Sequence, residues 1–449
     1  MSACVVVGGG VVGLLCALLA RQRYQQVTLV EKSDSCGGLL GSFSRNGACY
    51  DYGTHIPAPT GVAELDALLY GSGEERKRDY HSFPYLLSEN FHNGHWYPSS
   101  PLIDARTLSP DLYHRGMTEL LLAEGAPLEE RNLYRYLRAT FGETFTESIY
   151  RPVMRKVQGE DLENLERDVL RLFGLQRLIA LTPEATRKLK AIPGYDASLG
   201  FHSYTEGAVA IPYIYPRGNG GIGAWPARLE HRVRELGCDI RLGESVNRIR
   251  NGSGRVDAVV LAGGDTLPCD RLIWTIPPIF ACRAAGIEVG GGRPAFRSHT
   301  LVHLRYAQPF LKHRPQYLLC WEPTLQSYRI TLYPNITPER NAAGVHNLTV
   351  EVLGGPEAEL QTAAIAQRVE RELVEISVVA RENPVVDSAA VFLGPSFPVL
   401  TPAFVAASKE QCTALKSCLA NLDLLGRGSA AFFINDLLLQ AWHSLKENT

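Results

Sequence analysis

The stretch Ala3–Gln22, ACVVVGGGVVGLLCALLARQ, decides the fold. It contains no charged residue before Arg21, and a membrane-spanning helix needs about 20 predominantly apolar residues. A secretory signal would start with a positively charged segment, whereas here the first basic residue follows the apolar run. The stretch also holds Gly8, Gly10 and Gly13 at the spacing G-x-G-x-x-G. A third interpretation therefore outweighs the membrane ones: a strand that leads through a phosphate-binding loop into a helix.

The residues around these glycines predict a complete β-α-β unit. ACVVV is typical of a buried parallel strand, LLCALLARQ has high helix propensity, and QVTLVEK predicts a second strand that ends near Glu31. Gly8 would permit the tight turn, Gly10 would let the backbone approach a pyrophosphate, and Gly13 would let the helix pack on the strand. The helix N-terminus would offer N–H groups to the phosphates, and Glu31 would bind ribose hydroxyls. The sequence predicts dinucleotide binding.

The composition is that of an ordinary globular protein. The 449 residues correspond to two or three domains at roughly 100–200 residues each. A net charge of -2 gives no electrostatic reason to expect nucleic acid or an anionic membrane as a partner. The charged run EERKRDY (74–80) is interpreted as a solvated loop. The chain has no internal repeat that would indicate a solenoid.

The ten cysteines carry a prediction about metals and cellular location. They follow no regular spacing and form no Cys-x-x-Cys, so we expect neither a zinc site nor a dithiol motif. Scattered cysteines of this kind suit the reducing cytoplasm.

A second glycine motif narrows the ligand. KSDSCGGLLGSF (32–43) follows Glu31 and carries the doublet Gly37-Gly38 and then Ser42. This segment resembles the second glycine motif of flavoproteins that bind FAD through a Rossmann-like domain, among them amine oxidases, protoporphyrinogen oxidases, phytoene desaturases and UDP-galactopyranose mutases. Leu39 departs from the family pattern, which often has Arg at this place. The resemblance implies FAD as the cofactor.

Segments along the rest of the chain extend the resemblance. ACYDYGTHIP (48–57) is similar to the family segment that passes along the flavin, although His55 could equally be a turn or core histidine. YIYPRGNGGIGAWPARLEHRVRELGCDIRLGESVNRIR (213–250), DRLIWTIPP (270–278) and NLDLLGRGSAAFFINDLLLQAW (421–442) match later family segments. The resemblance assigns these residues to the cofactor: Gly8, Gly10, Val11, Val12, Gly13, Glu31, Lys32, Gly37, Gly38, Leu39, Ser42, Tyr52, Gly53, Thr54, His55, Val246, Thr275, Gly426, Arg427, Ala431 and Phe432.

The positions of these motifs predict the architecture. We expect an α/β fold with a Rossmann-like FAD-binding domain around a central parallel sheet, built from residues 1–79, 205–295 and 396–449. An α+β substrate domain would be inserted in two pieces, a helical one at 80–204 and an antiparallel sheet at 296–395. HTLVHLRYA (299–307) and SYRITLYPN (327–335) indicate strands of that sheet, and ELQTAAIAQRVERELVEI (359–376) indicates a helix.

The substrate residues depend on a closer resemblance. SYRITLYPNITPERN (327–341) looks like a segment of UDP-galactopyranose mutases, in which Tyr328, Arg329 and Asn335 would match substrate-binding positions. An arginine pair, Arg329 with Arg427, would suit a diphosphate, because each guanidinium can make two charge-assisted hydrogen bonds. The alternatives are a surface strand arginine at 329 and a flavin or helix contact at 427. Trp96 and Tyr97 could line a pocket or pack in the core.

The reaction stays open between three classes. The first is a FAD-dependent oxidoreductase in which a small molecule loses hydride to flavin N5, for instance in sugar, polysaccharide or secondary-metabolite biosynthesis. The second is a nucleotide-sugar mutase that acts through reduced FAD, and the third is a homologue that binds FAD without turnover. No catalytic residue follows from spacing, and His55, Arg329 and Arg427 are the candidates. The partner in each case would be a small molecule, with a nucleotide sugar as one option.

Overall fold

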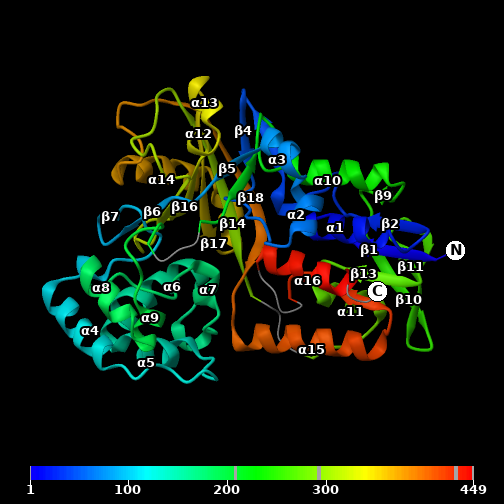
Figure 1. The fold of residues 1–449 in the computed structure, drawn as a ribbon, viewed down its shortest axis with the longest axis horizontal. Coiled ribbons are helices and arrows are strands. Elements are labelled where there is room, and N and C mark those ends of the chain that lie inside the picture. Colours follow the sequence, from blue (N-terminus) through cyan, green and yellow to red (C-terminus); the bar gives the residue numbers. More distant parts are fainter. Residues whose placement is uncertain (1, 207–209, 291–294, 429–432, 447–449) are drawn as a thin grey trace. The chain divides into compact units, whose positions relative to one another are not determined.

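The structure, a computed structural model, describes residues 2–206, 210–290, 295–428 and 433–446 (Figure 1). The chain divides into two compact units. Unit 1 comprises Met1–Ser82, Pro212–Arg293 and Val405–Thr449, and unit 2 comprises Phe83–Ile211 and Pro294–Phe404. The roles predicted for these segments, cofactor binding and substrate binding, stay predictions.

Unit 1 is built on a five-stranded sheet in which every neighbouring pair is parallel, in the order β19-β13-β1-β2-β9. All five residues of β1 are buried, as expected for an apolar strand at the centre of a parallel sheet. The predicted α/β class with a central parallel sheet is confirmed. The strands are β1 (Ala3–Val7), β2 (Gln26–Val30), β9 (Asp239–Arg241), β13 (Arg271–Trp274) and β19 (Leu422–Leu424).

Helix α1 (Val11–Ala20) explains the long uncharged run at the start of the chain. All ten of its residues are buried, so no position on the helix is open to a charged side chain. It packs against α10 (Ala224–Glu235) and α16 (Ile434–Lys446). Among the described residues, none of the helices combines the length and the apolar character that crossing a bilayer requires.

The remaining elements of unit 1 surround this core. The expected loop at residues 74–80 was wrong, because helix α3 covers Gly73–Asp79. Glu74 and Glu75 lie in its first turn and the basic residues at 76–78 in its last, an order that complements the helix dipole, although the acidic Asp79 ends the helix. The other elements are β3 (Ser42–Arg45), β4 (Ala48–Asp51), α2 (Ala63–Tyr70), β5 (Tyr80–Phe83), β8 (Tyr213–Pro216), β10 (Val246–Gly252), β11 (Arg255–Leu261), β12 (Thr266–Pro268), α11 (Pro278–Ala285) and α15 (Pro402–Cys418).

Unit 2 contains a seven-stranded sheet in the order β18-β14-β17-β16-β15-β6-β7, antiparallel except for the pair β15 and β6. Alternate residues of its central strands, such as Val302, Ile330 and Val350, form an apolar core with helix α14 (Thr362–Glu375). The strands are β6 (Ser88–His92), β7 (His95–Tyr97), β14 (Phe296–Tyr306), β15 (Tyr317–Cys320), β16 (Ser327–Leu332), β17 (His346–Gly354) and β18 (Val385–Pro398).

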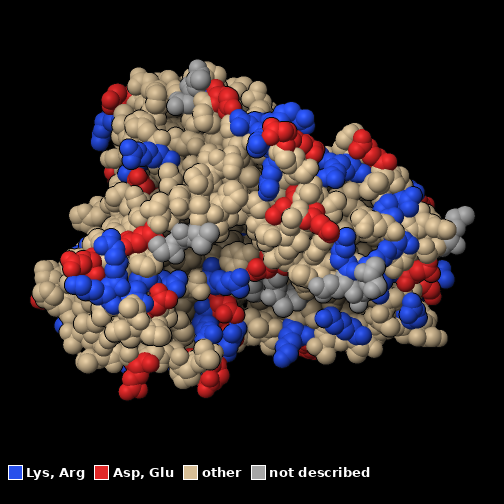
Figure 2. Space-filling model, viewed as in Figure 1, with Lys and Arg blue, Asp and Glu red and all other residues tan. Residues whose placement is uncertain are grey.

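Six described α-helices of unit 2 lie in the first inserted segment, which was expected to be helical, although strands β6 and β7 also lie there. They are α4 (Pro110–Leu122), α5 (Leu133–Phe145), α6 (Arg151–Gln158), α7 (Val169–Phe173), α8 (Pro183–Lys190) and α9 (Pro193–Ser198), and two short helices, α12 (Tyr333–Ile336) and α13 (Pro338–Ala342), follow β16. On the face of the molecule shown in Figure 2, basic and acidic side chains are interspersed, in keeping with the net charge of -2.

Candidate cofactor site

The three glycines of the motif after β1, Gly8, Gly10 and Gly13, are each required for a different physical reason. Gly8 has φ 104°, a backbone conformation that L side chains rarely adopt, and a Cβ on it would lie 2.4 Å from Thr275 Oγ1. A Cβ on Gly13 would lie 1.8 Å from the carbonyl oxygen of Gly8, so only glycine lets the helix approach the strand this closely. A Cβ on Gly10 would meet no atom within 4 Å. The absence of a side chain at Gly10 therefore leaves open space beside the loop, in which a ligand can reach the backbone.

The first turn of α1 faces this space without a side-chain cap. Gly10 stands at the N-cap and provides no side-chain hydrogen bond to the turn, and Val11 and Val12 follow as buried residues. The N–H groups at the start of a helix need acceptors, and they attract anions together with the helix dipole. This arrangement suits a pyrophosphate.

Glu31 follows directly on β2 and supports the same loop. Its Oε2 accepts a hydrogen bond from Gly9 N at 2.6 Å, and its Oε1 accepts one from Ser33 N at 2.8 Å. Each carboxylate oxygen can accept more than one hydrogen bond, so capacity remains for ribose hydroxyls. The sequence predicted the ribose role and missed the loop contact, which a spacing motif does not reveal.

The second glycine motif lies against the first. Gly37 N donates to the carbonyl oxygen of Gly9 at 2.9 Å, and the two segments form an isolated bridge between Gly10 and Gly37. Gly37 and Gly38 have φ values of 116° and 57°, and nothing lies within 4 Å of a Cβ on Gly38. Lys32 and Leu39 are exposed nearby. The two motifs therefore form one backbone surface that is open to a ligand.

A buried carboxylate, Asp51, holds the segments around this surface together. Asp51 is 1% exposed and accepts hydrogen bonds from Ser42 Oγ at 2.6 Å, from Tyr215 Oη at 2.6 Å and from Ile222 N at 3.0 Å. Ser42 Oγ also accepts one from Gly223 N at 2.8 Å. These bonds engage the Ser42 hydroxyl within the protein, which gives it a supporting role that the sequence comparison did not indicate.

The carboxyl ends of β1, β13 and β19 bring the remaining predicted positions together. Thr275 follows β13 and donates from Oγ1 to the carbonyl oxygen of Val7 at 2.8 Å. A Cβ on Gly426, after β19, would lie 2.2 Å from the carbonyl oxygen of Thr275. Arg427 is exposed beside it. In open parallel sheets ligands bind at this edge, so the loops after three parallel strands form one continuous candidate site.

The other predicted cofactor positions have varied surroundings. Gly53 is buried with φ 110°, whereas Tyr52, Thr54 and His55 are half-buried in the segment after β4. Val246 starts β10 and packs against the core beneath that strand. Ala431 and Phe432 lie outside the described residues.

Tyr328, Arg329 and Asn335, which the mutase resemblance assigned to the substrate, lie in unit 2 and make their contacts there, whereas Arg427, the other arginine of the expected pair, belongs to unit 1. Arg329 on β16 forms a two-fold ion pair with Glu351 on β17, from Nε at 2.7 Å and from the terminal nitrogen at 2.8 Å. Glu351 is fully buried and also lies 3.0 Å from His299 Nε2. Burial would raise the pKa of Glu351, but the nearby Arg329 and His299 outweigh it and hold that pKa well below its usual range.

The aromatic and amide candidates in unit 2 are packed or hydrogen-bonded. Tyr328 is 4% exposed and its ring contacts Trp321 and Phe173. Asn335 donates from Nδ2 to the backbone oxygens of Lys312 and Pro315. Of the two alternatives for Trp96, the structure favours core packing, with its indole N–H donating to the carbonyl oxygen of Ile376.

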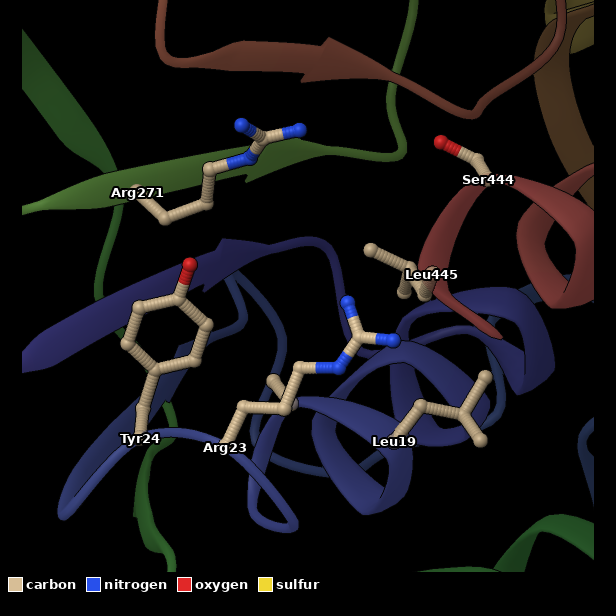
Figure 3. Close-up of a pocket in the computed structure, with 7 residues that line it drawn as sticks. Leu19, Arg23, Tyr24, Arg271, Ser444 and Leu445 are labelled. Carbon is tan, nitrogen blue, oxygen red and sulfur yellow. The ribbon is translucent and has the colours of Figure 1, made fainter. Parts of the chain in front are cut away.

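A cavity of about 320 Å³ in unit 1 lies at the opposite edge of the parallel sheet (Figure 3). Its lining includes Leu19, Arg23, Tyr24, Arg271, Ser444 and Leu445, from the last turns of α1 and α16, the segment that follows α1 and the first residue of β13. Its arginines have structural partners: Arg271 pairs with Asp423 at 2.6 Å, and Arg23 donates to the carbonyl oxygen of Lys446 at the end of α16. Two helix C-termini and a carboxylate disfavour an anion here.

The glycine surface, the uncapped helix start and Glu31 fit an adenine dinucleotide, and comparisons with known proteins identify which one. Residues 13–389 match the model of the family described as flavin containing amine oxidoreductase. The 4,4'-diapolycopene oxygenase of Methylomonas sp is 24% identical over 282 residues, covering 60% of this chain and 54% of that protein. A zeta-carotene-forming phytoene desaturase of Myxococcus xanthus is 26% identical over 280 residues, 60% of this chain and 52% of that protein. The chain thus spans about half the length of these relatives.

Solved structures show the same fold over the whole chain. Reduced UDP-galactopyranose mutase superposes with a TM-score of 0.79 at 17% identity and covers 100% of this chain and 95% of its own. A putrescine oxidase variant gives a TM-score of 0.65 at 13% identity over 100% of this chain and 98% of its own. These likenesses show the fold alone. With the family match, they establish that the chain belongs to the flavin containing amine oxidoreductase family and that its cofactor is FAD.

Proposed function

We propose that this flavin-dependent oxidoreductase oxidises a small molecule by removing hydride from a substrate carbon. A proton leaves the substrate with the hydride, so that the substrate loses two electrons and two hydrogens. When bound, FAD supplies the hydride acceptor. Oxygen or another acceptor would then take the electrons from the reduced cofactor.

The chain's own residues have defined parts in this proposal. The first turn of α1 and the backbone at Gly10 would bind the pyrophosphate, and Glu31 would bind the ribose while it braces the loop through Gly9 N. Gly426 would let the backbone after β19 pass close to Thr275 at the same edge of the sheet. These contacts orient the cofactor and leave the choice of substrate to unit 2.

The ion pair between Arg329 and Glu351 is the observation that favours oxidation over a mutase reaction. A mutase role asks Arg329 to bind the diphosphate of a nucleotide sugar. Its guanidinium already makes two hydrogen bonds, at 2.7 and 2.8 Å, to a fully buried carboxylate, and breaking such a pair leaves a charge buried without its partner. The curated relatives also support oxidation, since their names describe an oxygenase and a desaturase.

Anaerobic titration of the purified holoenzyme tests the proposal. The flavin absorbance near 450 nm is followed while amines, a porphyrinogen, a carotenoid precursor and UDP-galactopyranose are added separately. Bleaching by one class, with the oxidised product identified by mass spectrometry, is the expected result. Turnover of UDP-galactopyranose only after dithionite reduction and without net oxidation would instead favour the mutase, and Arg329→Ala should then weaken UDP-sugar binding. No response in either redox state would indicate a FAD-binding protein without turnover.

We also propose that the protein works in the cytoplasm. All ten cysteines are free, and seven of them are buried. A reducing compartment keeps thiols in this state. Fractionation of the source cells followed by immunodetection checks the location, and recovery of the protein outside the cytoplasmic fraction would contradict it.

A further inference from the structure

A second cavity, of about 540 Å³, lies wholly within unit 2. It is formed by the end of β14, the second half of α14 and the segment that leads into β18. None of its residues belongs to the predicted cofactor or substrate set. Its lining includes Tyr306, Glu370, Arg371, Glu375, Arg381 and Asn383.

Tyr306, one of the residues that line this cavity, carries a buried phenol. The residue is 3% exposed, and its ring packs in the apolar core beside Phe310, with the ring centres 6.0 Å apart. Its hydroxyl is buried and has no hydrogen-bond partner among the described residues. Burial, with the charge of Glu370, raises the pKa of Tyr306, so the hydroxyl keeps its proton at neutral pH. A buried donor without an acceptor is costly, and an acceptor atom in the cavity would remove that cost.

Charged side chains of both signs line the same space. Arg371 and Arg381 are exposed and form no hydrogen bond or ion pair in the part of the chain that the structure describes. Glu375 is likewise exposed and without a partner among those residues, and Glu370 accepts a hydrogen bond from Ser388 Oγ at 2.9 Å. Two guanidinium groups suit a carboxylate, and two carboxylates suit an ammonium group.

One wall of the cavity is held in place before any ligand arrives. Asn383 is 5% exposed and binds the backbone of Gln308 twice: Oδ1 accepts from Gln308 N at 2.9 Å, and Nδ2 donates to the carbonyl oxygen at 2.9 Å. These bonds tie the segment that carries Arg381 to the end of β14, where Tyr306 lies. Fixing a wall in this way lowers the cost of ordering it on binding.

We propose that this cavity binds a small zwitterion, with its carboxylate at Arg371, Arg381 and the Tyr306 hydroxyl and its ammonium group at Glu370 and Glu375. The ligand class is an amino acid or a short amino-terminated carboxylic acid. The site is separate from the glycine surface and Glu31, and binding involves no covalent or redox step.

Calorimetric titration of the oxidised holoenzyme with matched compounds tests the proposal. The probes are 4-aminobutyrate and 6-aminohexanoate, each compared with the acid and the amine of the same chain length. We expect saturable binding of at least one amino acid, about tenfold tighter than its acid or its amine, because each loses one set of charge-assisted hydrogen bonds. Equal binding of butyrate or hexanoate, or no saturable binding of any probe, would overturn the proposal.

Three variants locate the binding. Arg381→Gln and Tyr306→Phe should each weaken amino-acid binding about fivefold or more, since each removes a donor to the carboxylate. Tyr306→Phe removes a hydroxyl that has no partner, so its urea unfolding midpoint should not fall, and a fold defect cannot explain a loss of binding. Arg115→Gln, at an exposed arginine of α4 without a described partner, is the matched control and should bind like the wild type. Unchanged binding in both cavity variants would overturn the proposal. Bleaching of the flavin by the amino acid would show that the amino acid binds at the reaction site, and this result would also overturn the proposal.

Discussion

Two regions of the molecule are built on opposite principles. One is the glycine surface of unit 1, the backbone exposed at Gly10 and Gly38, and the other is the cluster of charged side chains on the sheet of unit 2. At the glycine surface, backbone groups face open space because side chains are absent at Gly10 and Gly38. In the unit 2 sheet, the side chains of Arg329, Glu351 and His299 are close to one another. A surface formed by missing side chains leaves a spacing pattern in the sequence, whereas a cluster of side chains on separate strands leaves none. Substitutions at both places can test this difference.

The largest effect is expected at Gly13, with Gly10 as its matched control. Gly13→Ala places a methyl group 1.8 Å from the carbonyl oxygen of Gly8, so strand and helix must move apart, at a cost of about 1–3 kcal/mol or more. We expect the variant to be purified without flavin and to unfold at lower urea. Gly10→Ala meets no atom within 4 Å and has φ -68°, which any residue adopts. It should fold normally.

The flavin content of these two variants separates packing from ligand approach. Gly10→Ala should lower FAD affinity by about tenfold or more, equivalent to about 1.4 kcal/mol, while the unfolding midpoint of its apoprotein stays close to that of the wild-type apoprotein. The ratio of absorbance at 450 and 280 nm after dialysis measures the effect. Full flavin retention by Gly10→Ala would show that the open space at this glycine is not used by the cofactor.

The second largest effect is expected for the buried ion pair between Arg329 and Glu351. Glu351→Gln leaves Arg329 without its counter-charge, and breaking a buried pair by removing one partner costs about 3–5 kcal/mol. We expect a loss of that size in the free energy of unfolding from urea titration, with FAD still bound. The double variant Arg329→Met/Glu351→Leu should recover most of it, because neither charge remains buried. If Glu351→Gln is as stable as the wild type, the pair is not closed in solution, and Arg329 is again available to a diphosphate.

The same pair predicts a pH dependence. The folded pKa of Glu351 is held well below its usual range, so the contribution of this carboxylate to stability is complete above the unfolded pKa of about 4.3. It is lost progressively as the pH falls below that value toward the folded pKa. The stability difference between wild type and Glu351→Gln should therefore shrink as the pH falls below 4. A difference that instead grows in acid would contradict the lowered pKa.

These regions also differ in how much of their structure the sequence predicts. Strands β1 and β2, helix α1 and the glycine positions follow from apolar spacing and from glycine requirements that are local in the chain. Strands β6 and β7, in contrast, lie in a segment that was expected to be helical, and β6 pairs with β15 of the other inserted segment. The charged segment at 74–80 was expected to be a loop, but most of it forms helix α3, in which Glu74 and Glu75 precede the basic residues in an order that suits the helix dipole. Glu351 and Asp51 gain their importance only from partners on other elements, such as Arg329 and Tyr215. Their pairing depends on strand register and tertiary packing, which a local pattern does not contain.

The smallest effect is expected for substitution of Ser42. This residue can distinguish a side chain that binds the cofactor from one that supports the packing beneath it. The sequence comparison places it at the cofactor, whereas its hydroxyl donates to Asp51 and accepts from Gly223 N. If its role is to support Asp51, Ser42→Ala should cost about 1 kcal/mol of unfolding free energy, the net worth of a hydrogen bond, and leave the dissociation constant of FAD within about threefold. If the hydroxyl also binds FAD, the affinity should fall further than the stability does. Urea titration and flavin fluorescence on the same sample measure both quantities, and their ratio decides whether this position belongs to the ligand surface or to the packing beneath it.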